Sequence, residues 1–357
     1  MARALVSKDD TGDGAVMFRP TEEDFVVEEI PAYLPVGSGE HLYLHIEKRG
    51  LSTPEMLRRL RQVFDLDERD VGFAGQKDAW GVTRQWVSVP ARHVEPRVSE
   101  LEAAVGVRLL EAKRHQNKLR LGHSRGNAFS LVVQGELSLP ALQERARCLA
   151  DSGTPNYFGA QRFGHQDRVL RDAERFLLRP RPARTRRELF WVSAVQSAIF
   201  NAWLSDRVGD GSWTSALDGD VLQKTDNGAP FLCDDPIKDA TRAAAGEVSC
   251  TGPLHGQRMR CAERDALTCE SRSAERIGVN VAELLRHPAF ASGARRAGRV
   301  FVDGMDLQPV AGGFRISFSL PPGSYASVFL RELVGPRLLD AAFADAPTPP
   351  AAAVERT

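Results

Sequence analysis

The chain contains 357 residues, and its 47 lysines and arginines balance 47 aspartates and glutamates, so the formal net charge is zero. With 42% hydrophobic and 26% charged residues, the composition is that of a globular protein and excludes a fibrous or disordered chain. At roughly 100–200 residues per domain, the length favours two domains. No stretch reaches the roughly 18 apolar residues that a membrane span needs, and the first residues lack a signal peptide's apolar segment, so we expect a cytoplasmic protein.

The first half of the chain is predicted to be rich in β-strands. Ser52 is followed three residues later by Glu55, with Pro54 between them, which predicts the start of a helix that has one apolar face. The loop 76–81 is short and joins two predicted strands. The predicted strands are 24–30, 41–46, 71–75, 84–89 and 119–133, and the predicted helices are 52–64 and 140–150.

The second half differs in character. The turn-rich segment Gly153–Gly159 predicts a domain boundary, and the uncharged segment 189–204 predicts a helix buried on most sides. Residues 218–253 read as irregular, because turn residues interrupt them repeatedly. Further predictions are helical structure at 279–296, an alternating strand at 314–320, a closing helix at 325–334 and a disordered tail at 346–357.

Two segments break the neutral charge balance locally. Six cationic residues lie between positions 108 and 125 against one acid, and eight arginines lie between 168 and 187 against two acids. Only seven of the 47 cationic residues are lysines, so 40 are arginines; codon bias explains such a ratio, yet arginine also suits phosphate binding. A charged run is commonly just a solvated face, but two separate basic segments in a neutral chain are also typical of a protein that binds a polyanion.

The remaining candidate functional groups are few. Five cysteines form no C-x-x-C pair and are odd in number, so we interpret them as free thiols and predict neither a zinc site nor a disulfide framework. Asp78 lies in the short loop 76–81, where an aspartate commonly serves as a turn former. The glycines at 75 and 81 and the adjacent Lys77 also suit a carboxylate that is held at the rim of a sheet.

Five ordered motifs resemble the signatures of the tRNA pseudouridine synthase D (TruD) family. The first of them, Gly72–Asp78 followed by Val82–Trp86, contains the loop just described. The resemblance covers roughly residues 19–334. The other four motifs are Glu23–Glu28, Arg114–Gly122 running into Gly126–Phe129, Pro155–Gly164, and Leu320–Ala326 followed by Arg331–Leu333.

This resemblance implies roles for five residues. Asp78 matches the catalytic aspartate, the nucleophile that acts on a flipped-out uridine. Phe25 and Asn127 match residues that contact the target nucleotide. Tyr325 stands where the family commonly has a phenylalanine against the flipped base, and Arg19 stands where a lysine can pair with the catalytic carboxylate. Tyrosine adds a hydroxyl and arginine needs a different geometry from an ammonium, so these two matches are looser.

The resemblance also implies the architecture and the partners. It implies an α+β fold, in which a pseudouridine-synthase-type catalytic domain with a central mixed β-sheet covers 1–152 and 304–345. An inserted α/β TRUD domain covers 153–303. The expected partner is tRNA, with uridine 13 as the target, and we expect a monomer with no cofactor, no metal and no membrane association.

Other interpretations remain open from the residues alone. On spacing, Phe25 suits a core position and Asn127 suits a turn, while His115 and His123 suit either phosphate contacts or an ordinary surface. One alternative function is a noncatalytic RNA-binding or RNA-folding protein on the same scaffold. Another is a carboxylate-dependent glycosidase, which requires a second catalytic carboxylate and has no need of basic segments.

Overall fold

The computed structural model describes residues 16–18, 21–77, 79–164 and 167–335. Its contacts divide these residues into two compact units. We call the unit formed by 16–136 and 304–323 the large-sheet unit, and the unit formed by 137–303 and 324–335 the small-sheet unit. The sequence-based split at 152/153 and 303/304 differs from this division mainly at 137–152 and at 324–335, and the catalytic and inserted domains stay a prediction.

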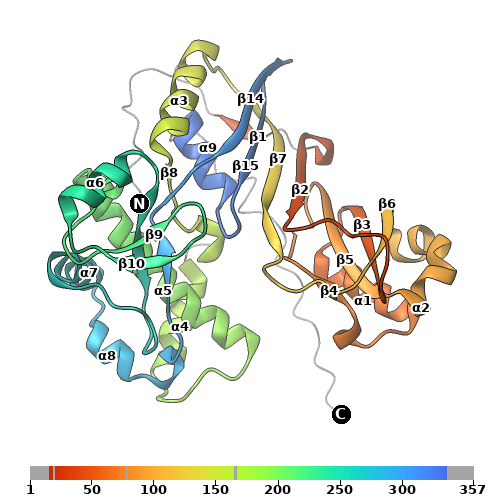
Figure 1. Ribbon diagram of the computed structural model, residues 1–357, viewed down its shortest axis with the longest axis horizontal. Helices are drawn as coiled ribbons and strands as arrows, with labels where there is room; N and C mark the ends of the chain where they lie inside the picture. The colour runs from red at the N-terminus through yellow and green to blue at the C-terminus, as the bar shows by residue number, and fades with distance from the viewer. Residues whose placement is uncertain (1–15, 19–20, 78, 165–166, 336–357) are drawn as a thin grey trace. The chain divides into compact units, whose positions relative to one another are not determined.

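Nine strands form one sheet in the described part of the large-sheet unit, with the order β14-β15-β7-β2-β5-β3-β6, while β1 pairs with β7 and β4 with β5 (Figure 1). The β2–β5 pair is parallel and its neighbours are antiparallel, so the predicted central mixed sheet is confirmed. The strands are β1 (Met17–Phe18), β2 (Phe25–Pro31), β3 (His41–Arg49), β4 (Gly72–Phe73), β5 (Val82–Pro90), β6 (Arg108–His115), β7 (Ser124–Gln134), β14 (Asp303–Val310) and β15 (Gly313–Leu320).

Helix α1 (Thr53–Phe64) covers one face of this sheet, and α2 (Ala91–Val94) follows β5. The Ser52 side chain accepts a hydrogen bond from the Glu55 N–H at 3.4 Å, and Pro54 lies in the first turn, as the sequence predicts. Met56 and Leu60 of α1 pack on alternate apolar residues of β3 and β5. We call this the α1 face. The other face carries Tyr43 and Trp86, which pack with Leu119.

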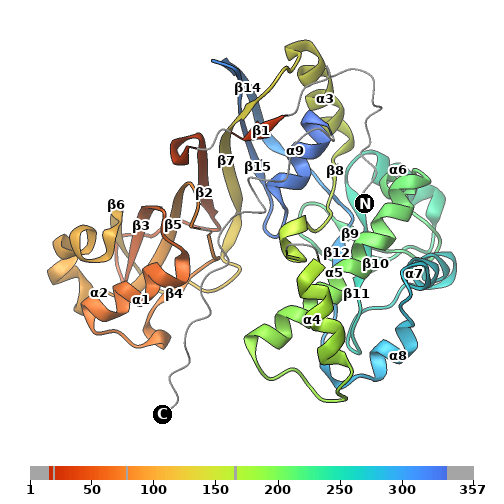
Figure 2. The ribbon, with the colours of Figure 1, turned by 180° about the vertical axis from the view of Figure 1, so that it is seen from behind.

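The small-sheet unit is built around the long helix α5 (Arg186–Gly209), which packs along β11 and, on another side, against α4; α4 and α5 lie side by side in both views (Figures 1 and 2). A four-stranded sheet has the order β10-β9-β11-β12, and β8 pairs with β13. The other elements are α3 (Leu139–Ser152), α4 (Arg168–Leu177), α6 (Pro236–Ala244), α7 (Arg264–Arg276), α8 (Val281–Arg286), α9 (Ala326–Val334), β8 (Thr154–Pro155), β9 (Val221–Lys224), β10 (Pro230–Leu232), β11 (Val248–Leu254), β12 (Ala294–Ala297) and β13 (Arg299–Val300).

Two sequence predictions are wrong in this unit. The region 218–253, predicted to be irregular, contains three strands of the small sheet and α6, because strands of three to seven residues leave room for many turn residues between them. The predicted helical segment 279–296 ends after α8, since Pro288 and Gly293 interrupt it and the chain then forms β12. In the described ranges, no helix is long and apolar enough to cross a bilayer. The tail 346–357 lies outside the described residues.

Candidate active site

The loop between β4 and β5 contains Asp78, which lies outside the described residues, as does Arg19. The residues before and after Asp78 are described, and several contacts fix them. The backbone N–H of Lys77 donates to Thr53 Oγ1 at 2.8 Å, and the Lys77 carbonyl accepts from the Thr53 N–H at 3.2 Å. Thr53 begins α1 and is fully buried. The chain entering Asp78 is therefore hydrogen-bonded to the first turn of a packed helix.

The Lys77 side chain turns inward to Glu29 of β2. Lys77 Nζ lies 3.3 Å from Glu29 Oε2, and the two side chains are 8% and 1% exposed. Glu29 Oε1 also accepts a hydrogen bond from the backbone N–H of Trp86 at 3.3 Å. Burial raises the pKa of Glu29, while the charge of Lys77 and the Trp86 N–H act in the opposite direction. The negative charge of Glu29 on β2 thus balances the positive charge of Lys77.

The end of the loop rests on Phe25. Gly81 has φ of +83°, and a Cβ at this position would lie 2.4 Å from the Phe25 carbonyl oxygen, so only glycine fits. The Phe25 ring lies 4.8 Å from the Trp80 ring, centroid to centroid. Both described flanks of Asp78 are therefore held against the α1 face and β2.

Sheet register brings Phe25 and Asn127 onto one face. In the antiparallel β2–β7 pair, Phe25 lies opposite Leu131 and Glu29 lies opposite Asn127. Residues two apart on a strand point to the same face, and so do residues directly opposite each other, so Phe25, Glu29 and Asn127 share the α1 face. The sequence predicted Phe25 and Asn127 but missed Glu29, although the alternation 25, 27, 29 was a signal for it.

Buried polar atoms on this face lack partners among the described residues. They are Asn127 Oδ1, Thr83 Oγ1 and Gln85 Nε2. A buried polar atom is nearly always hydrogen-bonded in a native protein, and an exception asks for a ligand or water. Asn127 can both donate and accept, so the open acceptor on this side chain suits the donor edge of a nucleobase.

Tyr325 belongs to the small-sheet unit, whereas Phe25 and Asn127 belong to the large-sheet unit. It precedes α9, and its ring meets Phe158 edge-on at 5.9 Å. The Arg296 guanidinium lies 4.1 Å from the centre of the Phe158 ring. Burial lowers the pKa of Arg296 to about 10, with Tyr325 opposing and Arg162 adding to the shift. Tyr325 therefore stands in an aromatic and cationic environment, which suits a base and its phosphate.

The two basic segments lie in different units. The segment 108–125 forms β6 and the loop that follows it, and the segment 168–187 forms α4 and the start of α5. Several of their arginines have acidic neighbours, such as Arg114 with Glu95 and Arg181 with Glu188. Most arginines of the second segment are exposed. The described residues contain no group of three or more His, Cys, Asp or Glu that could hold a metal ion.

Comparison with known proteins gives consistent results. The family model for tRNA pseudouridine synthase D (TruD) matches residues 4–180 and 182–333. The tRNA pseudouridine synthase D of Anaeromyxobacter sp. (strain Fw109-5) is 44% identical over 338 residues, which cover 92% of this chain and 95% of that protein. A protein of the same name from Thermus thermophilus is 39% identical over 330 residues, which cover 90% of this chain and 89% of that protein.

The fold also has a solved counterpart. The crystal structure of the putative TruD from Methanosarcina mazei matches with a TM-score of 0.67 and 21% identity, covering 91% of this chain and 94% of that chain. The resemblance carried by the five sequence motifs is thus confirmed over nearly the whole chain. The chain belongs to the tRNA pseudouridine synthase D (TruD) family.

Proposed function

We propose that this protein converts a uridine of tRNA, uridine 13, to pseudouridine, with Asp78 as the nucleophile. The proposal rests mainly on the position of Phe25 and Asn127, which share the α1 face. Glu29 and Thr53, which contact Lys77 next to Asp78, lie on the same side of the sheet. Asn127 adds an open hydrogen-bond acceptor there. The position of the uridine in the tRNA rests on the family resemblance.

The reaction is an isomerisation whose atoms balance without a co-reactant. The glycosidic bond between ribose C1′ and uracil N1 breaks, the uracil turns, and C5 bonds to the same C1′. The hydrogen on C5 leaves as a proton, and N1 takes one up. Asp78 acts as a nucleophile on ribose C1′ or on uracil C6, which splits the difficult exchange into two smaller steps.

The supporting residues have distinct tasks in this scheme. Flipping the target base out of folded RNA costs a few kcal/mol. Stacking on Phe25 or Tyr325 returns about 1–3 kcal/mol per base. Asn127 forms hydrogen bonds with the donor and acceptor groups on the edge of uracil. By the family resemblance we assign Arg19 as the cation beside the catalytic carboxylate, and a cation there favours the ionised form of Asp78.

Tritium release from tRNA that carries C5-tritiated uridine tests the nucleophile. We expect Asp78→Asn to reduce release by at least about 1,000-fold, because the amide cannot attack carbon. The matched control is Asp151→Asn, which makes the same chemical change at an exposed position of α3 and should release tritium like the wild type. Undiminished release by Asp78→Asn contradicts the nucleophile assignment. No release by the wild type from any tRNA favours the RNA-binding alternative.

A further inference from the structure

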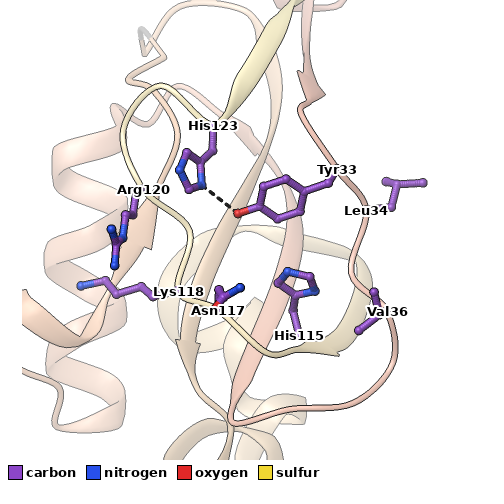
Figure 3. Close-up of a pocket in the computed structure, with 8 residues that line it drawn as sticks. All are labelled: Tyr33, Leu34, Val36, His115, Asn117, Lys118, Arg120 and His123. Carbon is purple, nitrogen blue, oxygen red and sulfur yellow. Dashed lines mark hydrogen bonds between the residues drawn. The ribbon is translucent and has the colours of Figure 1, made fainter.

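A pocket of about 560 Å³ lies on the face of the large sheet opposite the α1 face. This volume is within the roughly 300–1,000 Å³ of ordinary small-molecule sites. Figure 3 shows how its lining divides, with Lys118 and Arg120 on one side, Leu34 and Val36 on the other, and aromatic rings between them. The full lining is Tyr33, Leu34, Val36, His115, Asn117, Lys118, Arg120 and His123.

The polar side of the pocket is cationic. None of the eight lining residues, all of them described, is acidic. Lys118 donates to a backbone carbonyl, that of Arg69, so this contact does not neutralise its charge. Burial lowers the pKa of the nearby His41, and the charges of Lys118 and His115 add to that shift, against Glu40. This surface therefore favours an anion.

The centre of the pocket is aromatic. The Tyr33 and His115 rings are stacked with centroids 5.1 Å apart, and Tyr33 Oη lies 2.7 Å from His123 Nδ1. His115 is 9% exposed, and its Nδ1 has no hydrogen-bond partner among the described residues. On the apolar side, Leu34 and Val36 are 66% and 61% exposed. A ligand with a flat apolar part and an attached anion matches these two sides.

Hydrogen bonds hold the loop 117–122, which carries Lys118 and Arg120 of the pocket. Leu119 N–H donates to Ser88 Oγ and Gly122 N–H to the Ala74 carbonyl, both at 2.9 Å. Tyr43 Oη donates to the Asn117 carbonyl at 2.9 Å. These bonds fix residues 117–122 on β3, on β5 and on the segment just after β4. Lys118 and Arg120 therefore lie on a loop whose backbone is fixed by hydrogen bonds.

We propose that this pocket binds one unpaired nucleotide of the substrate RNA, with the phosphate on Lys118 and Arg120 and the base against Tyr33, Leu34 and Val36. The inference rests on the proposed function for the identity of the RNA. The pocket lies on the face of the sheet opposite Phe25 and Asn127, so its nucleotide is a different one from the target uridine. A free nucleoside monophosphate has the same chemistry, and the test separates the two sources.

Fluorescence anisotropy with a labelled unmodified tRNA transcript measures binding independently of turnover. We expect Arg120→Gln to weaken binding about fivefold at 50 mM salt. Losing one phosphate contact should also reduce the fall in affinity between 50 and 200 mM salt by about threefold. Leu34→Ser should weaken binding without changing the salt dependence. Arg58→Gln, an exposed change on α1, is the control and should bind like the wild type.

Uridine 5′-monophosphate is the probe for the free-nucleotide source. One outcome is that the wild type binds this compound saturably, that Arg120→Gln abolishes this binding, and that Arg120→Gln leaves the affinity for tRNA unchanged. That outcome overturns the assignment to RNA and assigns the pocket to a free nucleotide. Weakening by Arg120→Gln but not by Leu34→Ser overturns the nucleotide assignment, because only an anion is then bound. If Arg120→Gln matches Arg58→Gln with both probes, the proposal is wrong. Failure of the wild type to release tritium would count against the proposed function and leave these binding results standing.

Discussion

Glu29 links β2 to β5 and to the residue before Asp78. Its carboxylate pairs with Lys77 and accepts from the Trp86 N–H, and Asn127 lies opposite it in the sheet. Removing two charges from water costs several kcal/mol per ion, so such a pair is stable only while both partners are present. The Glu29–Lys77 pair is therefore a sensitive point next to Asp78.

Replacing Lys77 by methionine leaves the Glu29 charge buried alone. We expect Lys77→Met to lower the free energy of unfolding by about 3–5 kcal/mol at pH 8. The pKa of Glu29 is already raised in the folded state, and losing Lys77 raises it further. A group with a raised folded pKa favours folding at low pH and loses that contribution as the pH rises. The loss should therefore shrink at pH 5, as urea denaturation at the two pH values would measure.

Two further variants make this test specific. Lys77→Met combined with Glu29→Gln removes both charges and should recover part of the lost stability. Arg58→Met removes an exposed cation from α1 and should leave the urea denaturation midpoint close to that of the wild type. Equal denaturation midpoints for wild type and Lys77→Met at both pH values contradict a buried pair.

At the scale of elements, α5 begins with a capping box, although no prediction from the sequence placed a helix start at Thr185. Thr185 Oγ1 accepts from the Glu188 N–H at 3.2 Å, and the Glu188 carboxylate accepts from the Thr185 N–H at 3.1 Å. The pKa of Glu188 is lowered to about 2, first by the hydrogen bond from Arg181 and then by the N–H of Arg184. The helix start thus combines capping with charge pairing inside the second basic segment.

Thr185→Ala should destabilise the small-sheet unit by about 0.5–2 kcal/mol, because an N–H of the first helical turn loses its partner. Thermal unfolding followed by circular dichroism would measure the change. Because the pKa of Glu188 is depressed, its contribution is present above the unfolded value and is lost as the pH falls toward 2. Thr268→Ala in α7, an exposed mid-helix threonine, is the control and should be neutral. An equal effect of the two changes speaks against the cap.

The elements also show what sequence alone can predict. Sequence patterns located β2, β3, β5, α1 and β15. The signal was clearest for α1 and β15, which each bury one face. It did not locate the four-stranded small sheet, whose short strands are defined by partners distant in sequence. The site follows the same division. Phe25 and Asn127 were predicted because they match family motifs. The Glu29–Lys77 pair and the Thr53–Lys77 bonds join residues that are 48 and 24 positions apart in the sequence, so no local pattern predicts them.

At the scale of the whole molecule, the net charge of zero is the sum of basic regions and acidic regions. Each unit has its own basic segment, in β6 and its following loop and in α4 and the start of α5. Acidic residues balance them in number, with 47 of each sign along the chain. Local positive potential, rather than net charge, decides whether a polyanion binds.

Affinity for unmodified tRNA should therefore fall at least tenfold between 50 and 200 mM salt, which corresponds to about two or more phosphate contacts. Replacing Arg168, Arg171 and Arg175 on α4 by glutamine should weaken binding and flatten this dependence, because all three side chains are exposed. Anisotropy across the salt range measures both effects. Affinity that barely changes with salt would be incompatible with phosphate binding by these segments.

The pairing of β7 with β15 has a consequence for biosynthesis. Gln134 at the end of β7 pairs with Gly313, and the intervening chain builds most of the small-sheet unit. At about 5–20 residues per second, a ribosome needs roughly 10–40 s to make that stretch. During this interval the β7 edge that will receive β15 lacks its final neighbour. A nascent chain must therefore keep a long strand edge from pairing with other chains until β15 has been made.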